Sequence, residues 1–102
     1  MAIAIDLRFK GATLEQYDRV LELMSLTHGG EGPPGALFHW VTETDDGIRV
    51  ADVWEDMETF ERFAEKQIGP YTRQAGFEGE PEITTYPVYN YLTAGSRVAA
   101  AS

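Results

Sequence analysis

The stretch FHWVTETDDGIRVADVW, residues 38–54, alternates apolar and polar side chains on both sides of a short acidic turn. Alternation with a period of two is typical of β-strands that have one buried face. The pair Asp46-Gly47 tolerates positive φ and is common in tight hairpin turns. The sequence therefore predicts a β-hairpin with strands at 36–43 and 48–55 and with Asp46-Gly47 as the turn.

One face of this predicted hairpin carries two polar residues, His39 and Asp52, next to Trp54. A turn at Asp46-Gly47 pairs His39 with Trp54, and a register shifted by two residues places His39 opposite Asp52. Both registers keep the three side chains on the same face, because side chains alternate along a strand. Directly opposed and diagonal neighbours lie within side-chain reach. We therefore expect a contact between His39 and Asp52.

Two more strands are predicted at the ends of the chain. Residues 2–9 alternate around Ile3, Ile5, Leu7 and Phe9 and predict the first strand. Residues 82–92 predict the last strand, and Pro87 marks it as an edge strand because proline cannot donate to a sheet ladder.

Two helices are predicted between these strands. Thr13 and Gln16 have the spacing of a capping box, which begins a helix that must end before the loop at 27–35, with its four glycines and two prolines. Asp56 is expected to cap a second helix that begins at Met57. Gly69-Pro70 is expected to kink or break that helix, with one more turn through 71–75.

The resulting order is β-α-β-β-α-β, which is the ferredoxin-like α+β pattern: a four-stranded antiparallel sheet with two helices on one face. We expect one domain over residues 1–92 and a mobile C-terminal tail over 93–102. The sheet face away from the helices would show the apolar residues Phe38, Trp40, Ala51 and Val53. Since a monomer rarely exposes such a patch, we expect a homodimer with two sheets packed face to face.

Composition limits the classes of partner. The chain has 102 residues and a formal net charge of −9, without a run of Lys or Arg, so nucleic acid and anionic membrane are poor partners. It has no cysteine, which excludes disulfides and thiol catalysis. No stretch approaches the roughly 20 apolar residues of a membrane span, and the first residues do not form a signal peptide. A cytoplasmic protein is expected.

The segment VWED followed by METFERFAEKQIGP, residues 53–70, resembles the dimeric α+β barrel superfamily. The similarity is to small bacterial proteins near the antibiotic-biosynthesis monooxygenase group, in which the third strand ends in a tryptophan before an acidic helix with spaced aromatic residues. It extends over about residues 2–92. The resemblance implies a ferredoxin-like fold that dimerises into an α+β barrel. It leaves the reaction open, because the superfamily includes oxygenases, haem degraders, isomerases and cyclases.

The candidate catalytic residues are His39 and Asp52. Asp52 would orient the imidazole, and His39 would transfer a proton. Trp54 and Tyr17 would form flat walls for an aromatic ligand. The alternative is a structural histidine whose hydrogen bond to Asp52 satisfies two buried polar groups. An open cavity around His39 would favour the catalytic hypothesis, and a closed core would favour the structural one.

Tyr86 and Asn90 are further candidate substrate-binding residues. They share one face of the predicted last strand, although the sequence does not tell which face points inward. The glycine-rich loop at 27–35 lacks the lysine and the following helix of a phosphate site, and is expected to cross over the mouth of a pocket. His28 in this loop has no second ligand at metal spacing, so we expect no metal.

Some functional residues of the related proteins are missing from this chain. Haem-degrading relatives use an asparagine on the first strand and a histidine on the second helix, and this chain has neither, so no cofactor is expected. Cofactor-free quinone-forming oxygenases share the asparagine and the tryptophan, of which only Trp54 is present. The leading hypothesis is a cofactor-independent oxygenase, cyclase or isomerase that acts on an aromatic or polyketide-like molecule. The alternative is a non-catalytic ligand-binding or structural homodimer.

Overall fold

The computed structural model describes residues 1–92 and Gly95 of the chain; the predicted tail at 93–102 otherwise lies outside the described residues. The elements follow in the order β1 (Ile3–Lys10), α1 (Leu14–Met24), β2 (Ala36–Thr44), β3 (Gly47–Trp54), α2 (Met57–Phe63), the π-helical turn η1 (Ala64–Ile68), α3 (Gly69–Gln74) and β4 (Glu82–Pro87).

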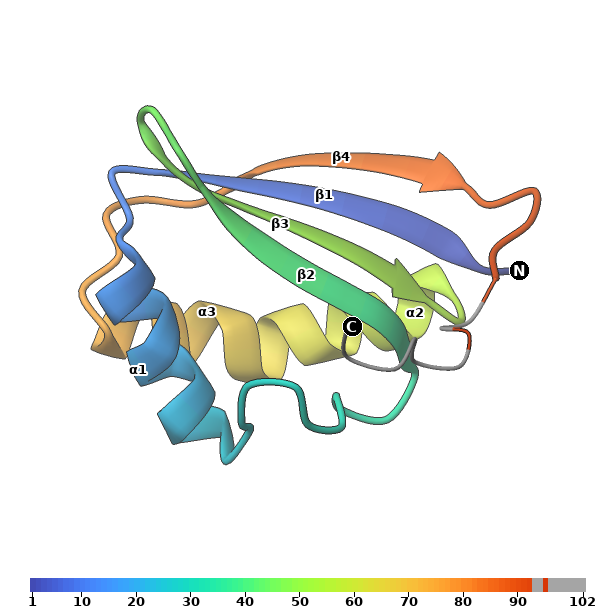
Figure 1. Ribbon diagram of the computed structural model, residues 1–102, viewed down its shortest axis with the longest axis horizontal. Helices are drawn as coiled ribbons and strands as arrows, with labels where there is room; N and C mark the ends of the chain where they lie inside the picture. The colour runs from blue at the N-terminus through green and yellow to red at the C-terminus, as the bar shows by residue number, and fades with distance from the viewer. Residues whose placement is uncertain (93–94, 96–102) are drawn as a thin grey trace, which may run out of the picture.

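The four strands form one antiparallel sheet in the order β2-β3-β1-β4, and the helices cover one face of it (Figure 1). The predicted ferredoxin-like α+β fold is therefore confirmed. As the position of Pro87 predicted, β4 is an edge strand, and β2 is the other edge.

The hairpin turn differs from the prediction by one residue. Thr44 pairs with Gly47, so the two turn residues are Asp45 and Asp46 and not Asp46-Gly47. This register places His39 directly opposite Asp52, which is the second of the two registers considered. The reason for a glycine at position 47 also differs: a Cβ there would lie 2.1 Å from the carbonyl oxygen of Phe9. Close approach of β1, and not positive φ, requires this glycine.

A register shift interrupts β2 immediately before His39. Ala36 pairs with Trp54 and Phe38 pairs with Val53, so Leu37 is an extra residue on its strand. Such bulges bend a strand and re-aim the neighbouring side chains. The bulge therefore lies where the strand carries its candidate catalytic residue.

The last strand is shorter than predicted. It ends at Pro87, which pairs with Ile3, the first residue of β1. One more backbone hydrogen bond joins the amide of Val88 to the carbonyl of Ala2 at 3.0 Å. The prediction of a strand through residue 92 was wrong: the ladder with β1 ends at Ile3, and the described residues after Val88 pair with no strand.

The helix starts agree with the predictions. Thr13 and Gln16 form a reciprocal capping box, with side-chain to backbone distances of 3.0 and 3.1 Å. The Asp56 carboxylate accepts a hydrogen bond from the Thr59 amide at 2.7 Å at the start of α2. Helix α1 ends at Ser25, whose φ of 62° is left-handed.

The predicted break at Gly69-Pro70 takes the form of a widened turn. Helix α2 continues through the π-helical η1 into α3, because Pro70 has no amide hydrogen to donate to the preceding turn. The Thr72 hydroxyl donates to the carbonyls of Ile68 and Gly69 at 2.6 and 3.1 Å. Such contacts of a threonine hydroxyl with the carbonyls three and four residues earlier are common within helices.

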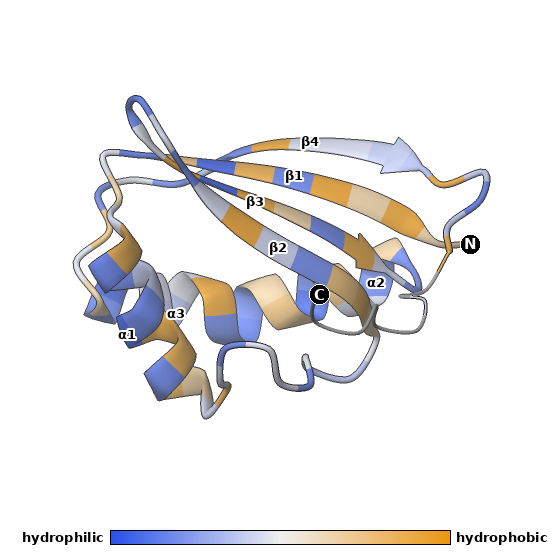
Figure 2. Ribbon diagram, viewed as in Figure 1, coloured by the Kyte–Doolittle hydropathy of each residue, from blue (hydrophilic) through white to orange (hydrophobic). Residues whose placement is uncertain are grey.

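The core lies between the sheet and the helices. It is built by inward residues of β1 and β3 together with one aromatic residue of α2: Ile5, Leu7, Phe9, Ile48, Val50, Trp54 and Phe60. Figure 2 shows the apolar and polar bands that alternate along these strands. Trp54 is 1% exposed and lies with ring centroids 5.7 Å from Phe60 and 5.0 Å from Phe63. No helix among the described residues is long and apolar enough to cross a membrane.

Candidate functional site

His39 and Asp52 are in contact on the sheet face that looks toward the helices. The imidazole Nδ1 lies 2.6 Å from the Asp52 Oδ1. The Asp52 side chain is 7% exposed, whereas the His39 side chain is 39% exposed. A carboxylate is thus buried behind a histidine that still reaches open space, which is the arrangement in which an acid orients a base.

Trp54 holds the other oxygen of this carboxylate. Its indole Nε1 donates a hydrogen bond to the Asp52 Oδ2 at 3.0 Å. Trp54 was expected only as a wall, and the pattern of the sequence did not indicate this bond. One signal could have revealed it: Asp52 and Trp54 are both inward residues of β3, with one residue between them.

Tyr17 from α1 completes the cluster. Its hydroxyl lies 2.6 Å from the His39 Nε2, and the two rings are nearly parallel, at 9° with centroids 6.0 Å apart. The sequence placed Tyr17 on the inner face of its helix as a wall. It gave no signal for a hydrogen bond, because that bond depends on how the helix is rotated over the sheet.

The four side chains form one continuous hydrogen-bonded chain, Tyr17–His39–Asp52–Trp54. Since a carboxylate accepts, it receives the Trp54 indole hydrogen and the His39 Nδ1 hydrogen. In the neutral imidazole this leaves Nε2 as the acceptor, so the Tyr17 hydroxyl donates to it. The direction of donation therefore runs from Tyr17 to His39 to Asp52, and a proton can move along it.

The environment favours the protonated phenol of Tyr17. Burial, followed by the negative charges of Asp52 and Asp18, raises its pKa from 10.0 to about 12. Tyr17 therefore keeps its hydrogen at neutral pH and can donate it to His39.

This shift predicts an effect on stability at high pH. Between pH 10.0 and about 12 the unfolded chain releases the Tyr17 proton while the folded chain keeps it, so the free energy of unfolding falls over that window. Tyrosinate absorbance should show one group in wild type that titrates near pH 12 and is absent from Tyr17→Phe. If both proteins titrate alike, Tyr17 does not have the surroundings described.

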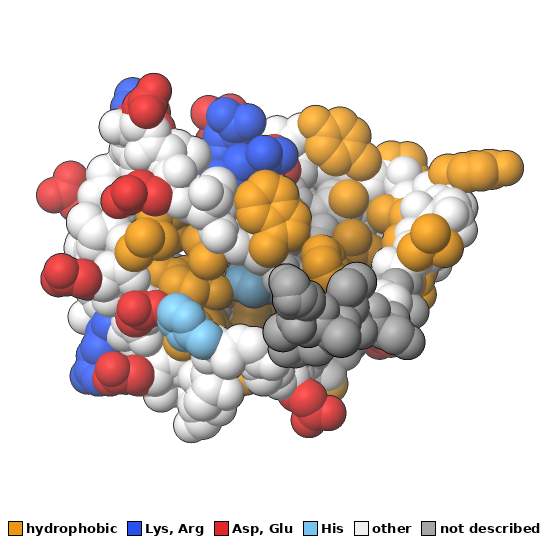
Figure 3. Space-filling view, in the orientation of Figure 1, with side chains coloured by type: hydrophobic (Ala, Val, Ile, Leu, Met, Phe, Trp, Pro, Cys, Tyr) orange, Lys and Arg blue, Asp and Glu red, His pale blue; other side chains and the backbone are white. Residues whose placement is uncertain are grey.

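These residues line a cavity of about 600 Å³ between the sheet and the helices. Its walls are mainly apolar and come from all layers of the fold, among them Leu7, Val20, Met24, Val50, Phe63 and Phe77. In Figure 3, a hollow on the side of the molecule turned toward the viewer has apolar side chains inside it and the pale-blue histidines beside it. The volume falls within the roughly 300–1,000 Å³ that is typical of small-molecule sites. His39 therefore faces a cavity and not a closed core.

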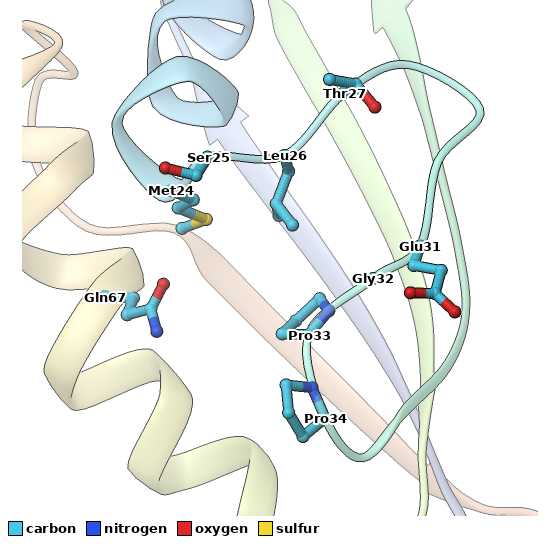
Figure 4. Close-up of a pocket in the computed structure, with 9 residues that line it drawn as sticks. All are labelled: Met24, Ser25, Leu26, Thr27, Glu31, Gly32, Pro33, Pro34 and Gln67. Carbon is cyan, nitrogen blue, oxygen red and sulfur yellow. The ribbon is translucent and has the colours of Figure 1, made fainter.

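A second cavity of about 420 Å³ is lined by the end of α1 and the loop that follows it (Figure 4). Met24, Glu31 and Pro33 belong to the walls of both cavities. Gln67 of η1 closes the smaller cavity on the helix side. Residues 27–33 of this loop thus belong to the wall of the larger cavity, and its position over the mouth stays a prediction.

The structure does not bring Tyr86 and Asn90 to this cavity. Tyr86 pairs with Ala4 and lies on the sheet face away from the helices, where it is 55% exposed. Asn90 follows the end of β4 and is exposed. Within one chain neither residue can contact a ligand that lies beside His39. The assumption of a common strand face failed because the strand ends before Asn90.

In the described part of the chain, no three side chains of His, Asp and Glu lie close enough to hold a metal ion together. The expectation of no metal rests on the sequence and stays a prediction. His28 instead pairs with Asp18 at 2.7 Å, where both side chains are exposed.

Comparison with known proteins rests on structure alone. No family model matches the sequence, and no curated protein matches it. Among solved structures, the chain is similar to a proposed antibiotic biosynthesis monooxygenase from Chloroflexus aurantiacus, with a TM-score of 0.57 and 18% identity over 92% of this chain and 100% of that one.

Two further structures are similar. A conserved protein from Methanosarcina mazei has a TM-score of 0.56 and 15% identity, with 84% of this chain and 91% of that one covered. A monooxygenase of Streptomyces coelicolor, solved in complex with the ligand nanaomycin D, has a TM-score of 0.52 and 18% identity, with 92% of each chain covered. Identities this low carry the fold and not the reaction. The chain therefore has the ferredoxin-like fold of the antibiotic biosynthesis monooxygenase-like proteins.

Proposed function

We propose that this protein is a cofactor-independent oxygenase that removes a proton from an acidic aromatic or polyketide-like molecule in the 600 Å³ cavity. The observation that carries this proposal is the hydrogen-bonded chain from Tyr17 through His39 to the buried Asp52. All three residues belong to the wall of that cavity. A base with a buried acid behind it, at the wall of an apolar cavity, is suited to proton abstraction.

The first step would be proton transfer through Tyr17. The substrate gives its proton to the Tyr17 oxygen while Tyr17 passes its own hydrogen to the His39 Nε2. The imidazolium that forms is stabilised by Asp52, which is fixed in place by the Trp54 indole. Tyr17 and His39 are thus the candidate catalytic residues, and Asp52 is a positioning residue.

The second step needs no electron from the protein. An aromatic carbanion or phenolate is electron-rich and can reduce dioxygen directly. For a hydroxyanthrone, two C–H bonds of the central methylene break, a C=O bond forms, and the second oxygen atom leaves as water. The organic molecule is oxidised to a quinone, and one dioxygen is reduced for each product.

Two observations support this choice of reaction. The cavity walls are mainly apolar and include Trp54 and Phe63, which suits a flat aromatic ligand. The fold is shared with monooxygenase structures, one of them bound to nanaomycin D. A cyclase or isomerase would begin with the same proton removal, and oxygen uptake separates an oxygenase from those two reactions.

The test is oxygen consumption with 1,8-dihydroxyanthrone, corrected for the reaction without protein. Wild type should consume dioxygen and form the anthraquinone, while Tyr17→Phe and His39→Gln should each lower turnover by about 10²–10⁴-fold. Glu43→Gln is the control, because Glu43 lies on the same strand and face as His39 but not in the cavity wall. Equal rates in wild type and both variants would refute the proposal.

The alternative, a non-catalytic ligand-binding or structural protein, is favoured by one observation. Both nitrogens of His39 already have partners within the protein, as in a structural histidine. This alternative predicts that 1,8-dihydroxyanthrone binds without oxygen uptake, and that His39→Gln lowers the stability of the protein and changes no rate.

We also propose that the protein is a homodimer formed through the outer face of the sheet. Phe38 and Trp40 are 52% and 42% exposed on that face. The Arg49 guanidinium lies 5.4 Å from the centre of the Trp40 ring and binds both oxygens of Asp6 at 3.1 Å. A second copy would cover these exposed aromatic side chains and the Arg49–Asp6 pair beside them.

Trp40→Glu is expected to yield monomer or aggregate, because it would place a carboxylate in a desolvated interface. Light scattering measures the mass. Leu14→Glu is the matched control, since Leu14 is 39% exposed on α1, away from the outer face. An intact dimer in Trp40→Glu would show that the interface lies elsewhere.

A further inference from the structure

The walls of the large cavity carry negative charge and no full positive charge. Among the described residues that line it, the acidic ones are Glu31 and Asp52, and none is a lysine or an arginine. On the face that shows the hollow, the blue side chains of Lys and Arg lie outside it (Figure 3).

Three arginines of the described part of the chain have acidic partners outside the cavity, and the other two, Arg8 and Arg73, are exposed and are not part of its wall. Arg19 pairs with Glu22 at 3.0 Å, and Arg62 pairs with Glu58 at 2.8 Å. Arg49 is held by Asp6 on the outer face of the sheet. None of these three can reach a ligand in the cavity without losing its partner, and none is part of the cavity wall.

The two histidines of the cavity wall also face acids. His39 is bound to Asp52, and His28 is bound to Asp18. Protonation of either imidazole therefore gives a neutral pair and not a free cation. A carboxylate ligand would enter an apolar cavity with no unpaired cation to compensate its desolvation, beside the buried Asp52.

We infer that the cavity selects uncharged aromatic molecules and rejects their carboxylate analogues, and that Glu31 is a specificity residue for this choice. This inference rests on the proposed function in one respect, namely that the cavity is the substrate site. Glu31 is exposed on the loop that follows α1 and belongs to the walls of both cavities, so its charge acts on a ligand in the larger one (Figure 4). The net charge of −9 acts in the same direction over a longer range.

The substrate class follows from this charge pattern. The cavity would take a phenol, an enol or a neutral ketone and not the aromatic acid. In a reaction sequence, a step that removes or masks the carboxylate of an aromatic acid, such as decarboxylation or lactone formation, would then have to precede this protein.

The test compares three ligands of nearly the same shape by isothermal titration calorimetry: 2-naphthol, naphthalene-2-carboxamide and naphthalene-2-carboxylate. At neutral pH the first two are uncharged and the third is an anion. Both neutral ligands should bind, and the carboxylate should bind at least 10-fold more weakly than the carboxamide. Because the carboxamide matches the carboxylate in size, a difference between them measures charge.

The role of Glu31 is tested with Glu31→Gln. This variant should strengthen carboxylate binding about 3-fold and leave carboxamide binding unchanged. Glu65→Gln is the matched control, because it removes one charge from η1 at a site outside both cavities. At 1 M NaCl, where screening acts beyond about 3 Å, the difference between wild type and Glu31→Gln should vanish.

Two results would overturn the inference. Carboxylate binding as tight as carboxamide binding would refute the selection of uncharged ligands. An equal gain in Glu65→Gln would refute the role of Glu31 and assign the effect to net charge. Neither result depends on turnover: a protein that discriminates these ligands but consumes no dioxygen would refute the oxygenase proposal and leave this inference standing.

Discussion

Asp52→Asn is expected to lower turnover of 1,8-dihydroxyanthrone by about 10³–10⁴-fold while the protein stays folded, as the equivalent change does in Ser-His-Asp enzymes. The asparagine oxygen can still accept the hydrogen of the Trp54 indole, which fixes the amide group so that its nitrogen faces His39. The His39 Nδ1 must then accept and Nε2 must carry the hydrogen, so His39 can no longer accept a proton from Tyr17.

The measurement combines oxygen uptake with ¹⁵N NMR of the His39 ring, which reports the tautomer. Asp52→Asn should show hydrogen on Nε2, and wild type should show it on Nδ1. Urea unfolding is the control for folding, and Glu43→Gln is the control for a neutral replacement nearby. An unchanged tautomer together with full activity would show that Asp52 does not position His39.

Trp54→Ala is expected to destabilise the protein by about 3–5 kcal/mol, the largest loss of stability for a single side chain here. The change leaves a cavity between Phe60 and Phe63 and removes the hydrogen bond to the buried Asp52. Trp54→Phe retains most of the ring volume and loses the donor, and should cost about 1–3 kcal/mol.

Chemical denaturation monitored by far-ultraviolet circular dichroism measures both losses. Tyr89→Ala is the control, since Tyr89 is 104% exposed and Trp54 is 1% exposed in the core. Equal losses in Tyr89→Ala and Trp54→Ala would contradict the burial of Trp54 between the sheet and the helices.

The fold could be predicted because the alternation in residues 38–54 and the capping residues Thr13 and Asp56 are local signals, and the structure uses them as predicted. The hairpin register could not be settled in this way. It depends on the contact of Gly47 with the Phe9 carbonyl, which comes from a strand far away in the sequence. The end of β4 likewise depends on where β1 begins.

The candidate site shows the same difference between local signals and contacts of distant segments. His39, Asp52 and Trp54 follow from strand parity, which is why the sequence placed them on one face. The bond between Tyr17 and His39 requires the rotation of α1 over the sheet, and no pattern within 14–24 encodes it. Tyr86 and Asn90 were assigned together because a strand through residue 92 was assumed, and the structure separates them from the cavity.

The hydrogen-bonded chain draws its members from α1, β2 and β3, and this has a consequence for dynamics. Helix α1 has 11 residues, whereas β2 and β3 are hydrogen-bonded to each other along most of their length. Short peripheral helices open more readily than paired strands, in partial unfolding events that leave the rest of a domain intact. Each such event would break the bond from Tyr17 to His39 and leave the bond from His39 to Asp52 in place. The hydrogen-bonded chain is thus complete only while α1 stays packed on the sheet. Amide hydrogen exchange in α1 would report how often that packing is lost.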